Sequence, residues 1–316
     1  MATSVQSQGV RGARHVGVTM LAAGAVLGAS IVTAPAATAQ TQPLTTVRCG
    51  QVLTSSVQVA NDLTDCPNDG LVAGADDITI DLGGRTLDGV GLGAGIRVDG
   101  RSGVAVAGGT VRDFDHGVLM GPGTRTTTVS DLTLADNQEA GVLLAGTGTG
   151  NQVLDSSFTL NALAVGLVDG TEGASVAGNA VGEGGGHGFL ISHAAGNRLE
   201  RNSVASGSDA GIVLESASHN VLRGNLITGV SDAAVLVEVE SDGNIVDANE
   251  LTDSDGGIIL DRSTGNILTG NSIHGMSDNG VDLEGSLDSV VMHNDLRFNG
   301  EGLALFDATG NWVEPT

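Results

Sequence analysis

The stretch Gly211-Ile-Val-Leu-Glu-Ser-Ala-Ser-His-Asn-Val-Leu-Arg-Gly-Asn225 is one copy of a unit that recurs along most of the chain. Its first residue recurs at steps of 22 to 25 residues, as Gly95, Gly117, Gly141, Gly166, Gly188, Ala234, Gly257, Gly280 and Gly302. Its last residue recurs at similar steps, as Asn179, Asn202, Asn249, Asn271 and Asn294. Two residue positions that recur with the same period, each forming a column of equivalent residues, identify a repeat protein.

The pattern inside each unit predicts strands. Residues 211–214 form a short apolar, β-branched run, a Ser/Asn/Gly turn follows, and Val221-Leu222 begin another run. No unit carries the 3.6-residue period of a helix. Three short strands fit into about 23 residues only if the chain coils, so that each strand pairs in parallel with its equivalent about 4.8 Å away. We therefore predict an all-β fold, a single-stranded right-handed parallel β-helix of about ten coils, with the asparagine amides stacked as a ladder.

The pattern Gly-hydrophobic-x-Leu…Asn-x-Ile-x-x-Asn, from about Cys49 to the C-terminus, resembles the repeat of a known group. The group is the secreted right-handed parallel β-helix proteins of the pectin-lyase-like superfamily, and the repeat is close to that of their NosD-like and carbohydrate-binding or sugar-hydrolase members. That scaffold hosts lyases, hydrolases, epimerases and non-catalytic proteins. The resemblance therefore implies a fold and not one activity.

The N-terminus has the pattern of a secretory signal peptide. Arg11 and Arg14 precede an apolar run over 16–34, and Ala37-Thr38-Ala39 supplies a small-residue cleavage site. A membrane anchor is the alternative, but the run is rich in Gly and Ala and ends at Pro35. We expect a signal peptide over 1–39, an N-terminal capping segment over 40–77 and the β-helix over 78–316, in a secreted, extracellular protein.

Cys49 and Cys66 are the two cysteines of the chain. In an exported protein such a pair forms a disulfide. Its expected role is structural, to fasten the segment that covers the open edge of the first coil. A reactive or metal-binding pair is the alternative, and the spacing disfavours it.

The charge of the chain excludes several partners. It has 37 acidic residues and 13 basic ones, with no lysine and a net charge of −24. Such a surface repels nucleic acid and anionic lipid, so we exclude nucleic acid and, after signal cleavage, a membrane. It also repels an acidic polysaccharide unless a divalent cation bridges the two. The oligomeric state stays open.

The outward positions of one strand per coil form an acidic column. Alternation points Ile212 and Leu214 inward and Val213 and Glu215 outward. At steps of 23 residues, the Glu215 position repeats as Glu238, Asp261 and Glu284. Carboxylates about 4.8 Å apart repel one another by about 3–4 kcal/mol at an effective dielectric of 20. Since Ca²⁺ prefers oxygen ligands, we predict a calcium-binding acidic groove, with a merely solvated polar face as the alternative.

A second set of acids precedes the repeating glycine by two residues, within Ser-Asp-x-Gly or Ser-Asp-x-Ala. These are Asp209, Asp232, Asp255 and Asp278. An aspartate before a glycine commonly bonds its own backbone in a turn, so their simplest role is turn formation.

Candidate catalytic residues come from the family resemblance. Lyases of the superfamily combine Ca²⁺-binding acids with an arginine base, and its hydrolases pair aspartates on adjacent coils. The resemblance implies Asp261 and Asp282 as an acid–base pair and Arg262 as a lyase base or uronate clamp. Whether the protein is an enzyme stays open. If it is one, we expect a polysaccharide lyase or a glycoside hydrolase.

The histidines give weaker signals. Gly186-His187-Gly188 is similar to a polygalacturonase element whose companion motifs are missing, and Phe114-Asp115-His116 is a fragment of an alginate-epimerase motif. His274 and His293 lie near methionines, but their spacing matches no copper-ligand motif. We expect no transition metal and no cofactor besides calcium.

Two functions follow from these patterns. In the first, the protein binds and processes an extracellular polysaccharide, such as a uronate polymer with calcium, along the acidic outer face. In the second, it is a non-catalytic structural or adhesive β-helix of the cell surface or matrix. Steps that never exceed 25 residues leave little room for the loops that build active sites, which favours the second function or a bare-groove binder.

Overall fold

The computed structural model describes residues 42–205 and 209–314. These residues form strands and turns without a helix, which confirms the all-β prediction. None of them builds a helix that could cross a membrane. The expected signal peptide, 1–39, lies outside the described residues.

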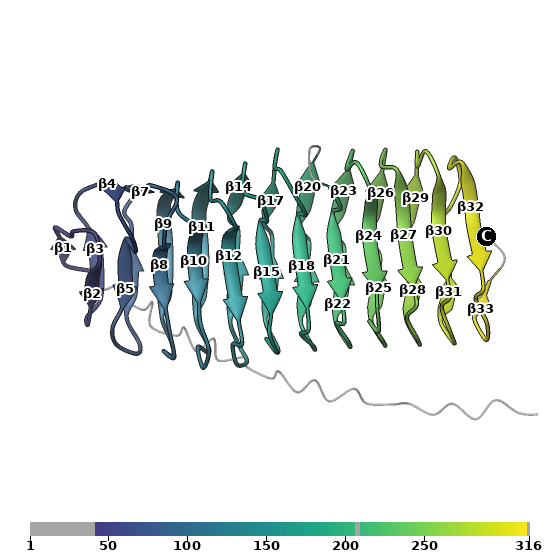
Figure 1. Ribbon diagram of the computed structural model, residues 1–316, viewed down its shortest axis with the longest axis horizontal. Coiled ribbons are helices and arrows are strands. Elements are labelled where there is room, and N and C mark those ends of the chain that lie inside the picture. Colours follow the sequence, from purple (N-terminus) through teal and green to yellow (C-terminus); the bar gives the residue numbers. More distant parts are fainter. Residues whose placement is uncertain (1–41, 206–208, 315–316) are drawn as a thin grey trace, which may run out of the picture. The chain divides into compact units, whose positions relative to one another are not determined.

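One face of the stack is a 12-stranded parallel sheet to which each coil contributes one strand (Figure 1). Its strands are β2 (Gln51–Leu53), β5 (Leu71–Ala73), β8 (Ala94–Val98), β10 (His116–Met120), β12 (Ala140–Ala145), β15 (Val165–Val168), β18 (Phe189–Ser192), β21 (Ile212–Glu215), β24 (Ala233–Glu238), β27 (Gly256–Asp261), β30 (Asn279–Glu284) and β32 (Glu301–Phe306).

A 21-stranded parallel sheet forms the rest of each coil and follows two ladders. The first ladder contains β1 (Leu44–Thr45), β3 (Val57–Val59), β6 (Thr79–Asp81), β9 (Ala105–Arg112), β11 (Thr128–Ala135), β13 (Gln152–Leu154), β16 (Ser175–Ala177), β19 (Arg198–Glu200), β22 (Val221–Arg223), β25 (Ile245–Asp247), β28 (Ile267–Thr269), β31 (Val290–Met292) and β33 (Trp312–Val313). The second contains β4 (Leu63–Cys66), β7 (Thr86–Gly89), β14 (Ser157–Thr159), β17 (Ala180–Val181), β20 (Ser203–Ala205), β23 (Leu226–Thr228), β26 (Glu250–Thr252) and β29 (Ser272–His274). The eight-residue strands β9 and β11 pair in both ladders.

The strand pairing confirms the predicted coil. Ile212 pairs with Val235 and Val235 with Ile258, so that residues one coil apart become neighbours. The sheet has 12 strands where about ten coils were predicted, because β2 and β5 already pair like later strands. Coil pairing therefore begins before Ile78, inside the segment expected to act as a cap. The predicted disulfide between Cys49 and Cys66 is present.

The repeating glycine is required by close approach between coils. A Cβ on Gly211 would lie 2.5 Å from the carbonyl oxygen of Ala234 and 2.6 Å from Cγ2 of Ile227. Gly166 does not belong to this column, contrary to the prediction. Val142 pairs with Val165, which places Ala164 opposite Gly141. With Ala164 in the column, the unusually long step that the prediction placed before Gly166 disappears.

Two asparagine ladders stabilise the turns of the later coils. In the predicted ladder, each Nδ2 donates to the Oδ1 of the next residue at 2.9 to 3.1 Å, through Asn179, Asn202, Asn225, Asn249, Asn271 and Asn294. A second ladder, at another turn, was missed and contains Asn197, Asn220, Asn244 and Asn266. All ten side chains are buried. Each also donates to a main-chain carbonyl, so that buried turns keep their polar groups satisfied.

The core is continuous along the stack and mainly aliphatic, with Phe114, Phe158 and Phe189 as its largest fully buried side chains. Ile212 and Leu214 point inward and are fully buried, as predicted. Val213 points outward, yet it is only 3% exposed. Its outward neighbours on adjacent coils are Leu190 and Leu236, and these larger side chains flank it on both sides.

Candidate functional site

The acidic column, Glu215, Glu238, Asp261 and Glu284, lies where the strands of the 12-stranded sheet end. Each member pairs directly with the next one. The predicted stacking of these four carboxylates is therefore confirmed, with neighbouring strands about 4.8 Å apart. The coils on either side carry Ser192 and Phe306 at this position, so the column spans four coils.

A left-handed turn follows the column in each coil. Ser216, Val239 and Arg262 have φ of 49°, 44° and 47°, and Gly285 has 58°. Because this turn reverses the chain directly after the carboxylate, the four acids lie along the corner of the stack. Three of them are half-buried, and Glu284 is exposed.

The left-handed turn at Arg262 places its guanidinium beside the preceding residue. Nη2 and Nε donate to Asp261 at 2.8 and 3.0 Å. The hydrogen bond that Arg262 donates to Asp261 raises the pKa of Arg262, which keeps the guanidinium charged. A charged guanidinium can clamp a carboxylate, whereas an arginine must lose its proton before it can act as a base. The geometry therefore suits the uronate-clamp role better than the base role.

Asp282 and Asp261 lie on adjacent coils but are not directly opposite. Asp261 pairs with Glu284, whereas Asp282 pairs with Ile259. A shift of two residues along the strand combined with one strand spacing separates their Cα atoms by about 8 Å. Asn279 donates to Asp282 at 3.2 Å. The structure thus brings the two predicted catalytic aspartates into the same neighbourhood on one face.

Electrostatic repulsion within the column is focused on Glu238. Burial raises the pKa of Glu238, and the flanking carboxylates of Glu215 and Asp261 raise it further. Ser192 donates to Glu215 at 3.2 Å, and Arg262 offsets the charge of Asp261. Glu238 has a carboxylate neighbour on both sides along the column and, unlike Asp261, no arginine at salt-bridge distance, so a bound cation would relieve the most repulsion at Glu238.

An apolar column runs beside the acidic one, two residues earlier in each strand. It consists of Leu190, Val213, Leu236 and Ile259. Asp282 takes the next position, so the apolar column ends where the predicted catalytic pair begins. The sheet face therefore offers aliphatic side chains with carboxylates along one margin. At the end of the acidic column, a shallow depression is lined by Asp261, Arg262, Glu284, Gly285, Phe306 and Asp307.

The second set of aspartates lies at the opposite ends of the same strands. Asp232 N–H donates to the carbonyl of Asp209 at 2.9 Å, and Asp278 N–H donates to that of Asp255 at 3.0 Å. Asp255 also accepts a hydrogen bond from the Ser277 hydroxyl. These contacts place the set at coil turns, in keeping with the expected structural role.

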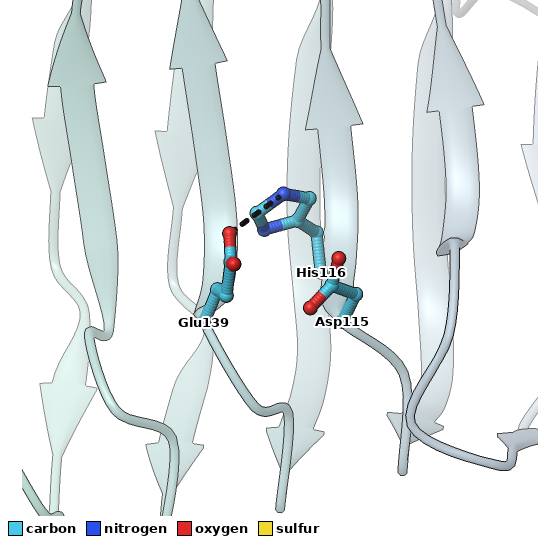
Figure 2. Close-up of side chains that lie close together, drawn as sticks. All are labelled: Asp115, His116 and Glu139. Atoms are coloured by element: carbon cyan, nitrogen blue, oxygen red, sulfur yellow. Dashed lines mark ion pairs between the residues drawn. The ribbon is translucent and has the colours of Figure 1, made fainter.

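A cluster that sequence reasoning did not assemble lies in the earlier coils (Figure 2). His116 is the first residue of β10 and Asp115 directly precedes it, and Glu139 comes directly before β12 on the next coil. One potential ligand atom from each of the three lies within 4.8 Å of the other two. The sequence contained one signal, the Asp115-His116 pair. The contribution of Glu139 depends on coil pairing.

Two family models match the chain. One describes a right-handed β-helix region and covers residues 94–250. The other describes the periplasmic copper-binding protein NosD and covers residues 229–314. No curated protein matches the chain significantly.

Several solved structures are similar to the chain. One is the A-module of a mannuronan C-5 epimerase from Azotobacter vinelandii, with 15% identity over 85% of this chain and 90% of that chain and a TM-score of 0.56. Another is an alginate lyase from a Paenibacillus species, with 14% identity over 82% and 99% of the two chains and a TM-score of 0.56. A third is the catalytic domain of a GH87 α-1,3-glucanase, with 11% identity over 85% and 63% and a TM-score of 0.61. At these identities the likeness shows the fold alone.

The residues in the NosD-matched segment do not fit a copper centre. His293 is exposed and pairs with Glu314 at 3.4 Å, and His274 is exposed at the end of β29. The nearby Met276 side chain is buried in the core. Among the described residues of 229–314, no three His, Cys, Asp or Glu side chains bring ligand atoms within 4.8 Å of one another. We derive no copper chemistry for this segment.

Proposed function

Because this chain is a right-handed parallel β-helix protein of the pectin-lyase-like superfamily, we propose that it binds an extracellular polysaccharide along the acidic column. The observation that carries the proposal is the alignment of that column with the apolar column on one sheet face. Sugar rings present aliphatic C–H faces and a rim of hydroxyl groups. The apolar column matches the first, and carboxylates accept hydrogen bonds from the second.

Calcium extends this proposal to uronate polymers. Burial and the neighbouring carboxylates raise the pKa of Glu238, so a cation held between Glu215, Glu238 and Asp261 would relieve the repulsion there. A net charge of −24 opposes an anionic polymer. Bridging Ca²⁺ ions would reverse that effect along the column. Glu284 extends the same oxygen-only donor set by one coil.

Processing of the bound polymer is the finer part of the proposal. Asp261 and Asp282 would serve as acid and base at the end of the apolar column, where Arg262 would clamp a uronate carboxylate. Their estimated Cα separation of about 8 Å leaves the carboxyl groups room to flank a glycosidic bond. The structural neighbours that act on alginate and α-1,3-glucan use the same scaffold for polysaccharide chemistry.

A second candidate is a non-catalytic structural or adhesive β-helix. It is favoured by the nearly constant length of the coils over most of the stack, since active sites are commonly built from longer loops. In either case we propose that the protein is exported, with 1–39 as its signal peptide. The disulfide between Cys49 and Cys66 is typical of oxidising compartments outside the cytosol.

Binding is tested by calorimetric titration of polygalacturonate and alginate, each with CaCl2 and with a chelator. We expect Ca²⁺-dependent binding that weakens at least about tenfold in a Glu215→Gln/Glu238→Gln variant, because two of four cation ligands lose their charge. Glu250→Gln is the matched control, since Glu250 is exposed on the other sheet of the same coils. Absence of Ca²⁺ binding and of polymer binding in the wild type would reject the proposal.

Catalysis is tested on the same polymers by the absorbance of unsaturated products and by reducing-end release. Product formation that Asp261→Ala or Asp282→Ala abolishes would establish processing. Binding without product would leave a polysaccharide-binding protein. The structural candidate would be favoured if neither assay detected binding or product and a neutral glycan array also showed no binding.

A further inference from the structure

The cluster of Asp115, His116 and Glu139 lies outside the acidic column and outside the NosD-matched segment. We propose that these three residues bind one divalent transition-metal ion of the zinc type. Asp115 and Glu139 would each supply a carboxylate oxygen, and His116 would supply an imidazole nitrogen. The inference does not depend on the proposed polysaccharide site, which lies several coils further along the stack (Figure 1).

The backbone of two adjacent coils holds the cluster in place. The N–H groups of Asp115 and His116 both donate to the carbonyl of Gly93 at 3.1 Å. The N–H of Glu139 donates to the carbonyl of Asp115 at 2.9 Å, and His116 pairs with Ala140. These main-chain hydrogen bonds fix the backbone position of each cluster residue in the absence of a metal ion. Pre-organisation of this kind lowers the entropic cost of assembling a site.

The imidazole of His116 is the least satisfied polar group of the cluster. Its Nδ1 is buried and has no hydrogen-bond partner, and its Nε2 lies 3.5 Å from Oε2 of Glu139, beyond a good hydrogen bond. A buried polar atom without a partner costs about 1–3 kcal/mol. A metal ion bound through the lone pair of Nδ1 would give this nitrogen a partner and would neutralise the two carboxylates, leaving the proton on Nε2.

The donor set selects the class of metal. One imidazole nitrogen and two carboxylate oxygens suit zinc and its neighbours, whereas Ca²⁺ takes six to eight oxygen ligands. Ligand atoms within 4.8 Å of one another need only small side-chain movements to reach bonding distances of about 2.0–2.2 Å.

One side of the cluster is open to solvent. The His116 side chain is 13% exposed, whereas that of Glu139 is 67% exposed. In Figure 2 the Glu139 carboxylate lies beside the imidazole, and the Asp115 carboxylate lies below the ring, near the base of the His116 side chain. Three protein ligands with a solvent-facing fourth position are typical of zinc sites that keep a bound water.

The test titrates ZnCl2 into the chelator-treated chain by calorimetry and CoCl2 by visible absorption. We expect one site per chain, with a Co²⁺ ligand-field band, and a loss of affinity of at least about tenfold in either His116→Gln or Glu139→Gln. His293→Gln is the matched control. It removes the other described histidine that faces a glutamate, at 3.4 Å, where no third ligand completes a cluster.

Three results would overturn the site. They are no Zn²⁺ binding by the wild type, Zn²⁺ binding that survives both cluster variants, and loss of binding in His293→Gln. Glu139→Gln keeps the test valid if His116→Gln does not fold, because the Glu139 side chain is mostly exposed. Polymer and Ca²⁺ binding by His116→Gln should equal the wild type. A failure here is thereby distinguished from a failure of the polysaccharide proposal.

Discussion

The early and late coils manage their negative charge in different ways. In the early coils, carboxylates pair with arginines across a coil boundary, as Asp69 does with Arg97 at 2.7 Å and Asp88 does with Arg112 at 2.8 Å. In the late coils, the four members of the acidic column stack on one another, and only Asp261 has an arginine partner at salt-bridge distance. The other sheet of the late coils also pairs carboxylates with arginines, as Asp247 does with Arg223 at 2.7 Å, so the contrast is between these ion pairs and the acidic column itself.

The pKa shifts follow the same division. Burial alone would raise the pKa of Asp69, but hydrogen bonds from Arg97 and from the N–H of Ala94 outweigh burial and lower it. Burial and two carboxylate neighbours raise the pKa of Glu238. Two residues depart from this division: in the early coils burial and Asp88 raise the pKa of Asp113, and in the late coils hydrogen bonds from Arg297 lower the pKa of Asp295 to about 2. The comparison teaches that uncompensated charge, and not charge as such, distinguishes the candidate site from the rest of the acidic surface.

The two regions also differ in how their turns are held. The first coils contain the disulfide, and β9 and β11 run on for eight residues each. The later coils divide the same path into strands of two or three residues separated by buried asparagines. Covalent and strand continuity thus stabilise one end, and amide ladders stabilise the other.

The largest effect is expected from breaking a ladder. In Asn225→Ala, the carbonyl of Leu199 loses its donor, and the main-chain N–H and Nδ2 of Asn202 lose their acceptor. At about 1–3 kcal/mol for each buried group, the free energy of unfolding should fall by about 4 kcal/mol in a urea titration. The exposed Asn68, in the early coils, is the control for Asn→Ala. A loss below about 1 kcal/mol in Asn225→Ala would show that the ladder is not what holds the late coils.

A slightly smaller effect is expected from removing the disulfide. The Cys49→Ser/Cys66→Ser variant frees a crosslink between residues 17 apart, worth about 3 kcal/mol for a loop of this size. Because each coil contacts only its neighbours, the loss should be local. Hydrogen exchange should quicken in β2 to β5 and stay unchanged in β21 to β30. Equal quickening at both ends would contradict the division into separately stabilised regions.

The sequence was sufficient for the features that repeat. The glycine column, the first asparagine ladder and the stacking of Glu215 on Glu238 all follow from a fixed step between identical environments. The prediction was wrong at Gly166. It placed this glycine in the same column as Gly141, although the two residues have different environments. Pairing assigns that place to Ala164.

Features that do not repeat were beyond sequence reasoning. Arg97 and Asp69 lie 28 residues apart, which is more than one coil. Their ion pair therefore depends on the orientation of each side chain. Glu139 meets His116 only because the coil between them brings His116 opposite Ala140. His187 occupies the equivalent position directly before Gly188, but the two coils between carry Ala140 and Leu163 there, so there was no continuous histidine column to detect. The unpartnered Nδ1 of His116 is a property of packing and has no sequence signature.

A moderate, pH-dependent effect is expected at Asp69. Because the folded pKa of Asp69 is lowered, its stabilising contribution is present above the ordinary aspartate pKa and is lost as the pH falls through the folded pKa. Asp69→Asn should therefore cost about 1 kcal/mol at pH 7 and nothing near pH 2, as measured by urea unfolding at both pH values. Asp99→Asn is the control, since Asp99 is more exposed and 3.9 Å from Arg97. A penalty that persists at pH 2 would mean that the carboxylate charge is not its source.

The smallest effect has the opposite sign and lies in the acidic column. Because the folded pKa of Glu238 is raised, its contribution to stability is present below the ordinary glutamate pKa and is lost as the pH rises through the folded pKa. Glu238→Gln should thus be more stable than the wild type at pH 7, by less than about 1 kcal/mol because solvent screens the column, and equal to it near pH 3.

Calcium sharpens this last prediction. CaCl2 should raise the melting temperature of the wild type more than that of Glu238→Gln, because the ion relieves a repulsion that the variant no longer has. The order of stability at pH 7 should then reverse, whereas Glu250→Gln, on the other sheet, should respond like the wild type. If Glu238→Gln gains nothing at pH 7 without calcium, the column stores no repulsion. Its carboxylates would then be a merely solvated polar face.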